Sequence, residues 1–172
     1  MRETNGHSAP QVRARLAEDM AGCVAALRAV HERDRYPVRW PSDPARWLAH
    51  DADGAGWVAH RDGRIVGHVL LVPPDGGDVA PGLLAPGTPV AVVSRLFVDP
   101  AARGQRIGAS LLERAAREAR RRGVRAVLDV VSTDSAAIAL YERLGWEFLA
   151  MGQQEWGPGE VVDVRCYAAP PA

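Results

Sequence analysis

The most constraining feature of this sequence is a strand, helix and strand pattern in its middle. Residues 90–98 are almost continuously apolar, which is typical of a strand buried on both faces of a sheet. After a turn that contains glycine, residues 107–122 carry apolar side chains at helical spacing and arginines on the opposite side. Gly123 is in the usual position of a glycine that ends a helix, and residues 124–131 return to a strand pattern. The apolar face of this helix consists of Ile107, Leu111, Leu112, Ala115 and Ala119. We therefore expect a sheet covered by this helix.

The first half of the chain adds a helix and a hairpin to this unit. Residues 12–16 alternate apolar and charged side chains, as a half-buried strand does, and residues 18–34 follow with helical spacing. The predicted buried face of this helix is Met20, Val24, Leu27 and His31. Two further strands, residues 57–60 and 64–72, are joined by Asp62-Gly63, which is a strong signal for a tight antiparallel hairpin.

The remaining segments complete an α+β pattern. Asp43-Pro44 is typical of a helix start, because Asp is a good cap and Pro suits the first helical position. Residues 73–89 are rich in Pro and Gly and predict a loop. A later helix begins after a cap at residues 132–134 and ends before Gly145. The last two strands are predicted at residues 146–151 and 161–167, with a glycine-rich loop at residues 152–160.

Composition limits the class of protein. The chain has 172 residues, which suits one domain, so we expect residues 1–172 to form a single domain with flexible ends at residues 1–10 and 169–172. Its 21 basic residues balance 21 acidic ones, which argues against nucleic acid as a partner. No apolar run approaches the roughly 18 residues of a membrane span, and the first residues do not resemble a secretory signal. We therefore expect a cytoplasmic protein without a membrane partner.

The cysteines and histidines do not suggest a metal site. Cys23 and Cys166 lie far apart and lack metal-ligand spacing, so we interpret them as core or surface thiols rather than ligands or a disulfide. The five histidines show no spacing typical of zinc ligands, and we predict no metal.

The turn between residues 98 and 107 has the composition of an anion site. It is followed by the start of a helix, where backbone N–H groups are unpaired and the helix dipole is positive. Gly104 and Gly108 allow a ligand to approach the backbone, and Arg103 and Arg106 add positive charge. These features suit a phosphate or a pyrophosphate. The alternative interpretation is a tight strand-to-helix turn that needs glycine for its geometry alone.

Two sequence blocks resemble the GNAT family of N-acetyltransferases. Arg103-Gly104-Gln105-Arg106-Ile107-Gly108-Ala109 resembles the family's pyrophosphate loop for acetyl-coenzyme A (acetyl-CoA), Arg/Gln-x-x-Gly-x-Gly/Ala. Residues 134–146 resemble the later motif, Asn-x-x-Ala-x-x-Leu-Tyr-x-x-x-Gly-Phe, and include Asp134 and Tyr141. The resemblance covers roughly residues 11–168. It implies a three-layer α/β fold with a mixed, mainly antiparallel sheet of about six to seven strands and about four helices.

The resemblance also implies roles for particular residues. Acetyl-CoA is expected as co-substrate, with its pantetheine arm paired along the backbone around Phe97 and Val98. Tyr141 matches the general acid that protonates the departing thiolate, and Asp129 resembles the base carboxylate of a bacterial family member. The predicted cofactor-binding residues are Phe97, Val98, Arg103, Gly104, Gln105, Arg106, Ile107, Gly108, Ala109, Asp134 and Tyr141. Weaker candidates for the base are Glu32, Asp34 and His68.

Two positions depart from the family pattern. Arg106 stands where the family has its middle glycine, so we expect ordinary φ and ψ angles there. Asp134 replaces an asparagine, and a carboxylate cannot donate the hydrogen bond of an amide, which favours a role as helix cap.

The predicted reaction is acetyl transfer to a primary amine of a small molecule or of a peptide N-terminus. A catalytically inactive domain that binds coenzyme A as a sensor or interaction module is the alternative. The acceptor itself is not encoded in any motif. Tyr36, Trp40 and Trp47 cluster around prolines and form either a wall of the acceptor site or a seal of the core. The resemblance makes a homodimer an expected oligomer, with the C-terminal hairpin as a candidate interface.

Overall fold

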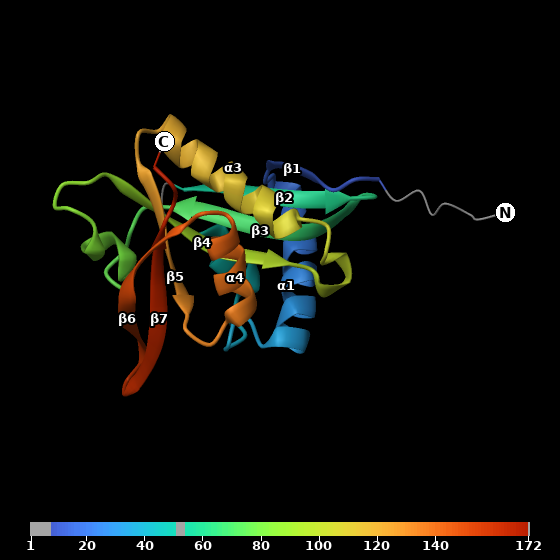
Figure 1. The fold of residues 1–172 in the computed structure, drawn as a ribbon. Coiled ribbons are helices and arrows are strands. Elements are labelled where there is room, and N and C mark those ends of the chain that lie inside the picture. The colour runs from blue at the N-terminus through green and yellow to red at the C-terminus, as the bar shows by residue number, and fades with distance from the viewer. Residues whose placement is uncertain (1–7, 51–53, 172) are drawn as a thin grey trace.

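Seven strands form one mixed sheet in the computed structural model, which describes residues 8–50 and 54–171. The strand order is β1-β2-β3-β4-β5-β7-β6, and within it only β4 and β5 run parallel (Figure 1). The strands are β1 Gln11–Ala14, β2 Ala55–Arg61, β3 Arg64–Val72, β4 Val90–Val98, β5 Arg125–Val131, β6 Glu147–Gly157 and β7 Glu160–Ala168. The predicted mixed, mainly antiparallel sheet is confirmed.

Helices cover both faces of this sheet. The α-helices of the described residues are α1 Met20–Asp34, α2 Pro44–Ala49, α3 Ile107–Arg121 and α4 Ser135–Arg143. Three short 3₁₀ helices accompany them: η1 Ala17–Asp19, η2 Ala80–Leu83 and η3 Pro100–Ala102. Helices α3 and α4 pack on one face, and α1 and α2 pack on the other (Figure 1). The expected three-layer α+β architecture is therefore confirmed.

Local sequence signals explain where several elements begin and end. Asp62 and Gly63 adopt φ of 50° and 76°, as a tight hairpin turn requires, so β2 and β3 pair directly. The Asp43 side chain accepts a hydrogen bond from the Arg46 N–H and caps α2. Gly123 ends α3 with a φ of 70°. All five residues predicted for the buried face of α3 are buried.

The most buried face of helix α1 is turned slightly from the predicted one, since Met20 and Val24 are partly buried and pack against the same core. Its buried residues are Cys23, Ala26, Leu27 and Val30, so of the predicted set only Leu27 lies in the fully buried face. The reason is close packing at Gly22, where an added Cβ would lie 2.8 Å from the Ile65 side chain. Small residues on this side let the helix approach the sheet, which favours burial of this face over the one with larger side chains.

The C-terminal hairpin is longer than predicted. Residues 152–160, predicted as a loop, continue both strands up to a turn at Gly159, which has a φ of 74°. Polar residues occupy this part of the hairpin because it extends beyond the core and both of its faces meet solvent. The usual apolar and polar alternation is absent for that reason. Residues 73–89 are largely irregular, as predicted, apart from η2.

The two cysteines are free and buried, so the interpretation as core thiols is confirmed for both. Ala169, in the terminal segment expected to be flexible, is buried and donates a 2.8 Å backbone hydrogen bond to Ala126. Residues 1–7 and residue 172 lie outside the described residues.

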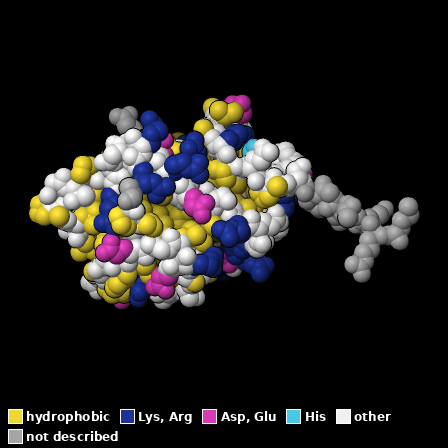
Figure 2. Space-filling view, turned by 45° about the horizontal axis from the view of Figure 1, so that its top comes forward, with side chains coloured by type: hydrophobic (Ala, Val, Ile, Leu, Met, Phe, Trp, Pro, Cys, Tyr) yellow, Lys and Arg dark blue, Asp and Glu magenta, His cyan; other side chains and the backbone are white. Residues whose placement is uncertain are grey.

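Charged side chains of both signs share the surface around α3 (Figure 2). Glu118 accepts hydrogen bonds from Arg121 and Arg122, which lie on the arginine-rich side of this helix. Arg125 pairs with Glu147. Among the helices that the structure describes, none has the length and apolar character needed to cross a membrane.

Candidate active site

Strands β4 and β5 separate part-way along their length. They pair only from Val90 with Arg125 to Val92 with Val127, and beyond this point the two strands diverge (Figure 1). The edge of β4 that faces this gap therefore has no partner strand after Val92. An unpaired strand edge inside a fold is a ready site for an extended ligand.

A bulge in β4 lies directly beside the gap. The register between β3 and β4 shifts between His68 and Leu70, and Arg95 adopts a φ of 49°. The Arg95 carbonyl lies 2.9 Å from His68 Nδ1, and the Arg15 guanidinium lies 2.8 Å from His68 Nε2. Arginine only donates, so Nε2 accepts and the Nδ1–H donates to the carbonyl. The fully buried His68 thus holds the bulge in place.

His68 is not available as a proton acceptor for substrate. Both of its ring nitrogens are engaged, and burial lowers the pKa of the imidazole to about 4. The ring stacks on Phe97 with centroids 5.2 Å apart.

The two predicted pantetheine contacts differ in orientation. Phe97 of β4 lies opposite His68 of β3. Two residues further along, the N–H of Asp99 donates to the Val66 carbonyl of β3. Alternation along the strand therefore directs the N–H and C=O of Val98 toward the gap. The Phe97 side chain packs among residues of α1 and α2, on the opposite face from α3.

The turn before α3 presents unpaired amides. The first hydrogen bond of the helix runs from Ser110 N–H to Arg106 C=O, so the helix leaves the N–H groups of Ile107, Gly108 and Ala109 unused. Gly104 has a φ of 81°, a conformation that glycine adopts without strain. Unused amides at the positive end of a helix are groups that suit an anion, so the predicted anion site stays a prediction that this geometry is compatible with.

Arg106 corrects one expectation. Its φ is 59°, in the left-handed region, and not the ordinary value that we expected for a residue replacing glycine. The turn geometry at the start of α3 imposes this conformation, at a cost of roughly 1–2 kcal/mol for a residue with a side chain. The backbone at Arg106 therefore has a conformation that glycine favours, as expected for the residue at this position in the family pattern.

The predicted basic side chains of this turn are held by neighbouring elements. Arg103 forms an ion pair with Asp34 at the end of α1. The Gln105 side-chain oxygen accepts a 2.7 Å hydrogen bond from Arg61 of β2. The Arg106 side chain is exposed. Backbone amides, rather than these side chains, are thus the groups that the turn directs at an anion.

Tyr141 lies on α4 with its ring in the core. The ring contacts Trp146 and Tyr167 at centroid distances of 6.1 and 5.8 Å. The residue is only 7% exposed, and its hydroxyl makes no hydrogen bond within the described residues. Burial raises the pKa of the Tyr141 hydroxyl, and electrostatic repulsion by Tyr36 raises it further. This phenol is protonated at neutral pH and available as a proton donor.

Asp134 caps helix α4. This is the role that we expected for an aspartate at a position where the family has asparagine. Its carboxylate accepts a 3.1 Å hydrogen bond from the Ala137 N–H.

Asp129, the predicted base, anchors a neighbouring turn. Its carboxylate accepts hydrogen bonds from the N–H groups of Val79 and Ala80, at 2.7 and 2.9 Å. The Gln154 amide donates a third at 2.7 Å. These bonds hold η2 against β5 and the C-terminal hairpin.

The sequence did not identify Arg95. The signal that could have pointed to Arg95 is a charged side chain within an almost entirely apolar strand. Its guanidinium stacks on Trp47 at 4.3 Å, and its Nε donates to the Trp47 carbonyl at 2.9 Å. The ring of Tyr36 lies edge-on to Trp47 at 6.4 Å, and burial raises the pKa of Tyr36 to about 12. Tyr36 and Arg95 thus both contact the ring of Trp47.

Comparison with known proteins gives this site a family. The model of the acetyltransferase (GNAT) family matches residues 21–146. The chain belongs to this family. It is 35% identical over 118 residues to mycothiol acetyltransferase from Saccharomonospora viridis, and the match covers 67% of this chain but only 37% of that protein.

Solved GNAT-type structures share the fold at low sequence identity. The ribosomal-protein-S18-alanine N-acetyltransferase from Escherichia coli superposes with a TM-score of 0.68 at 19% identity, covering 94% of this chain and 93% of that one. The structure of yncA from Salmonella typhimurium with its cofactor acetyl-CoA gives a TM-score of 0.66 at 22% identity, with 94% and 93% covered. These similarities confirm the fold predicted from the two motifs.

Proposed function

We propose that the chain is an acetyl-CoA-dependent N-acetyltransferase that acts on a primary amine of a small molecule or of a peptide N-terminus. The observation that carries this proposal is the gap between β4 and β5, together with the unused amides at the start of α3, the helix that packs on the same face as α4. Family membership and the acetyl-CoA complex of a fold neighbour support the choice of co-substrate.

The residues present fit acetyl-CoA as a ligand. The N–H groups of Ile107, Gly108 and Ala109 suit the pyrophosphate, since they combine unused donors with the positive end of a helix. The edge of β4 at Val98 suits an extended arm with amide groups, because such an arm pairs as a strand would. Acetyl-CoA supplies the acetyl group as a thioester.

Proton transfer is assigned to Tyr141. Attack by the amine forms a bond from nitrogen to the acetyl carbon and breaks the bond to sulfur. The departing thiolate takes the proton of the Tyr141 hydroxyl, whose raised pKa keeps it protonated until then. The amine loses its own proton to a base or to water. Asp129 is the predicted base that takes the proton from the amine. Both of its carboxylate oxygens already accept hydrogen bonds, from three donors in all.

Thermal unfolding with and without acetyl-CoA tests the proposal, with NAD as the control nucleotide. A ligand at about 100 times its dissociation constant adds about 2.7 kcal/mol to stability, which shifts the Tm by a few degrees. We expect a shift with acetyl-CoA alone, followed by thiol release when amines are added. A shift without turnover of any amine would favour the inactive coenzyme-binding module. No shift with either nucleotide would contradict the coenzyme site itself.

The expected homodimer stays a prediction. Edge strand β6 and its partner β7 expose Phe148, Met151, Trp156 and Val161, which makes the C-terminal hairpin the region to examine by sedimentation.

A further inference from the structure

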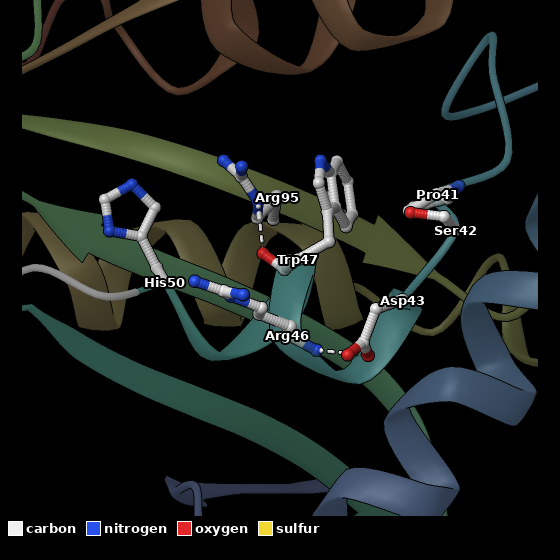
Figure 3. A pocket seen from close by; sticks show the side chains of 7 residues that line it. All are labelled: Pro41, Ser42, Asp43, Arg46, Trp47, His50 and Arg95. Atoms are coloured by element: carbon white, nitrogen blue, oxygen red, sulfur yellow. Dashed lines mark hydrogen bonds between the residues drawn. The ribbon is translucent and has the colours of Figure 1, made fainter.

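A pocket of about 670 Å³ opens between α2 and the β4 bulge (Figure 3). Trp47, Arg46 and His50 line it from α2 and its C-terminal end, and Arg95 lines it from β4. Figure 3 shows the Arg95 guanidinium beside the Trp47 indole, with the His50 ring on the same side of the helix. Trp47 was one of the aromatic residues that the sequence offered as a wall of the acceptor site, whereas Arg95 and His50 carried no such signal.

Arg95 brings a positive charge into the pocket without a carboxylate to balance it. Its Nε donates to the Trp47 carbonyl, and its Nη1 donates to the Ser94 hydroxyl at 2.7 Å. A guanidinium has five N–H donors, so three remain, on Nη1 and Nη2. Among the described residues no acidic side chain forms an ion pair with Arg95, although Asp75 and Asp78 influence it electrostatically from farther away.

His50 supplies a second unused polar group. Its Nδ1 is fully enclosed and makes no hydrogen bond within the part of the chain that the structure describes. An enclosed polar atom without a partner costs free energy unless a ligand or water satisfies it. Of the described residues that line the pocket, the acidic one, Asp43, is engaged as the cap of α2.

The pocket adjoins the proposed reaction site. Val92 is the last β4 residue that pairs with β5. Arg95 lies three residues further along β4, and so at the start of the gap. Tyr36 packs against Trp47, one of the residues that line the pocket, with ring centroids 6.4 Å apart. An acceptor whose amine lies in the gap can therefore extend a second group toward Arg95.

We propose that this pocket binds a carboxylate of the acceptor, so that the preferred substrates are small amines that also carry a carboxylate group. A guanidinium with free N–H groups on adjacent nitrogens matches the two oxygens of a carboxylate, and stacking on Trp47 keeps it oriented. This inference rests on the proposed function and specifies its substrate class.

The test compares matched acceptors that differ only in this charge. Amino acids and the corresponding amino acid amides are each assayed for kcat/KM with acetyl-CoA, for the wild-type protein and for Arg95→Gln. We expect the wild type to prefer the acid, and Arg95→Gln to lower the acid-to-amide ratio by about 10-fold to 100-fold. The amine of an amino acid and that of its amide differ in basicity. This difference is the same for every variant, so it does not affect the change in the acid-to-amide ratio.

Two further variants complete the design. Arg117→Gln removes an exposed arginine on α3, far from the pocket in the fold, and should keep the wild-type ratio. His50→Leu removes the enclosed nitrogen and should lower the ratio by about 3-fold to 10-fold, which covers the case in which Arg95→Gln folds poorly.

The outcomes separate this inference from the proposed function. Acetylation of uncharged amines with no preference for the acid, or a ratio unchanged in both pocket variants, overturns the carboxylate site and leaves the acetyltransferase intact. A protein that fails to bind acetyl-CoA in a calorimetric titration contradicts the proposed function instead.

Discussion

Tyr141 shows how one side chain combines a structural and a chemical role. Its ring packs against Trp146 and Tyr167 in the core, and its hydroxyl makes no hydrogen bond within the described residues. Burial raises the pKa of this hydroxyl, so the proton remains on oxygen at neutral pH. The core packing thereby fixes the position of the proton donor.

Tyr141→Phe should lower kcat by about 100-fold while acetyl-CoA binding persists, because only the donated proton is lost. Stopped-flow thiol release and calorimetry measure the two quantities. Tyr167→Phe is the matched control. It removes a hydroxyl that donates to Glu142 at 3.0 Å, and should lower stability by about 1 kcal/mol with little effect on kcat. An unchanged kcat in Tyr141→Phe would exclude it as the acid.

At the scale of elements, the start of α3 acts through its backbone. An added Cβ at Gly108 would lie 3.4 Å from the Leu140 side chain and 3.7 Å from that of Val98, which is ordinary contact. Alanine at this position is therefore compatible with the fold, and it favours the helix by up to about 1 kcal/mol.

Gly108→Ala should keep or raise the Tm and weaken acetyl-CoA binding, because the methyl group covers amides that face the pyrophosphate. Gly108→Val should weaken binding further. Calorimetric affinity and thermal unfolding, measured on the same samples, separate the two effects. Wild-type affinity in Gly108→Val would contradict the assignment of the turn to coenzyme binding.

The Asp129 carboxylate, on β5, accepts hydrogen bonds from the start of η2 and from β6, and so joins three elements. Asp129→Asn replaces an acceptor oxygen by an NH₂ group, which faces N–H donors and leaves them unpaired. We expect the free energy of unfolding to fall by about 1–3 kcal/mol. We also expect the pH profile of kcat/KM to keep its shape. Loss of the acidic limb of that profile in the folded variant would identify Asp129 as the base instead.

At the scale of the whole molecule, His68 links segments that are distant in sequence. Arg15, just after β1, donates to His68 and to the Leu48 carbonyl at the end of α2, while His68 holds the β4 bulge. Strand β4, beside the gap, is therefore linked to the N-terminal segment and to the helix that lines the pocket.

This network predicts a pH dependence of stability. Burial lowers the pKa of His68 from 6.5 to about 4, so between these values the unfolded state binds the proton more readily than the folded state. The free energy of unfolding should therefore be constant above about pH 6.5 and fall as the pH drops toward 4, by at most about 3 kcal/mol. Denaturant unfolding at several pH values measures this fall.

His68→Gln should be less stable at pH 7.5 and lose most of the slope between pH 6.5 and 4.5. An identical slope in the variant would assign the effect to another group. Asp19 and Glu118, whose pKa values arginine partners lower to about 2, contribute stability that is lost only at lower pH, below their ordinary values of 3.8 and 4.5.

Signals confined to neighbouring residues predicted most of the fold. The Asp62-Gly63 turn, the caps at Asp43 and Asp134, and the apolar face of α3 are each determined by residues within a few positions of one another. The predicted face of α1 is offset from the most buried one, because the close approach of Gly22 to Ile65 is a contact between distant residues. The C-terminal hairpin was cut short because its outer part has no buried face.

The sequence by itself determined the order of elements, the glycine-containing turn before α3 and the position of Tyr141, because these depend on local geometry and on short motifs. Only the tertiary structure decided where β4 and β5 part, that Asp129 anchors η2, and that Arg95 and His50 face one pocket with Trp47. These features depend on contacts between residues far apart in the chain. Burial and charge at such contacts are properties of the folded molecule, and no local pattern records them.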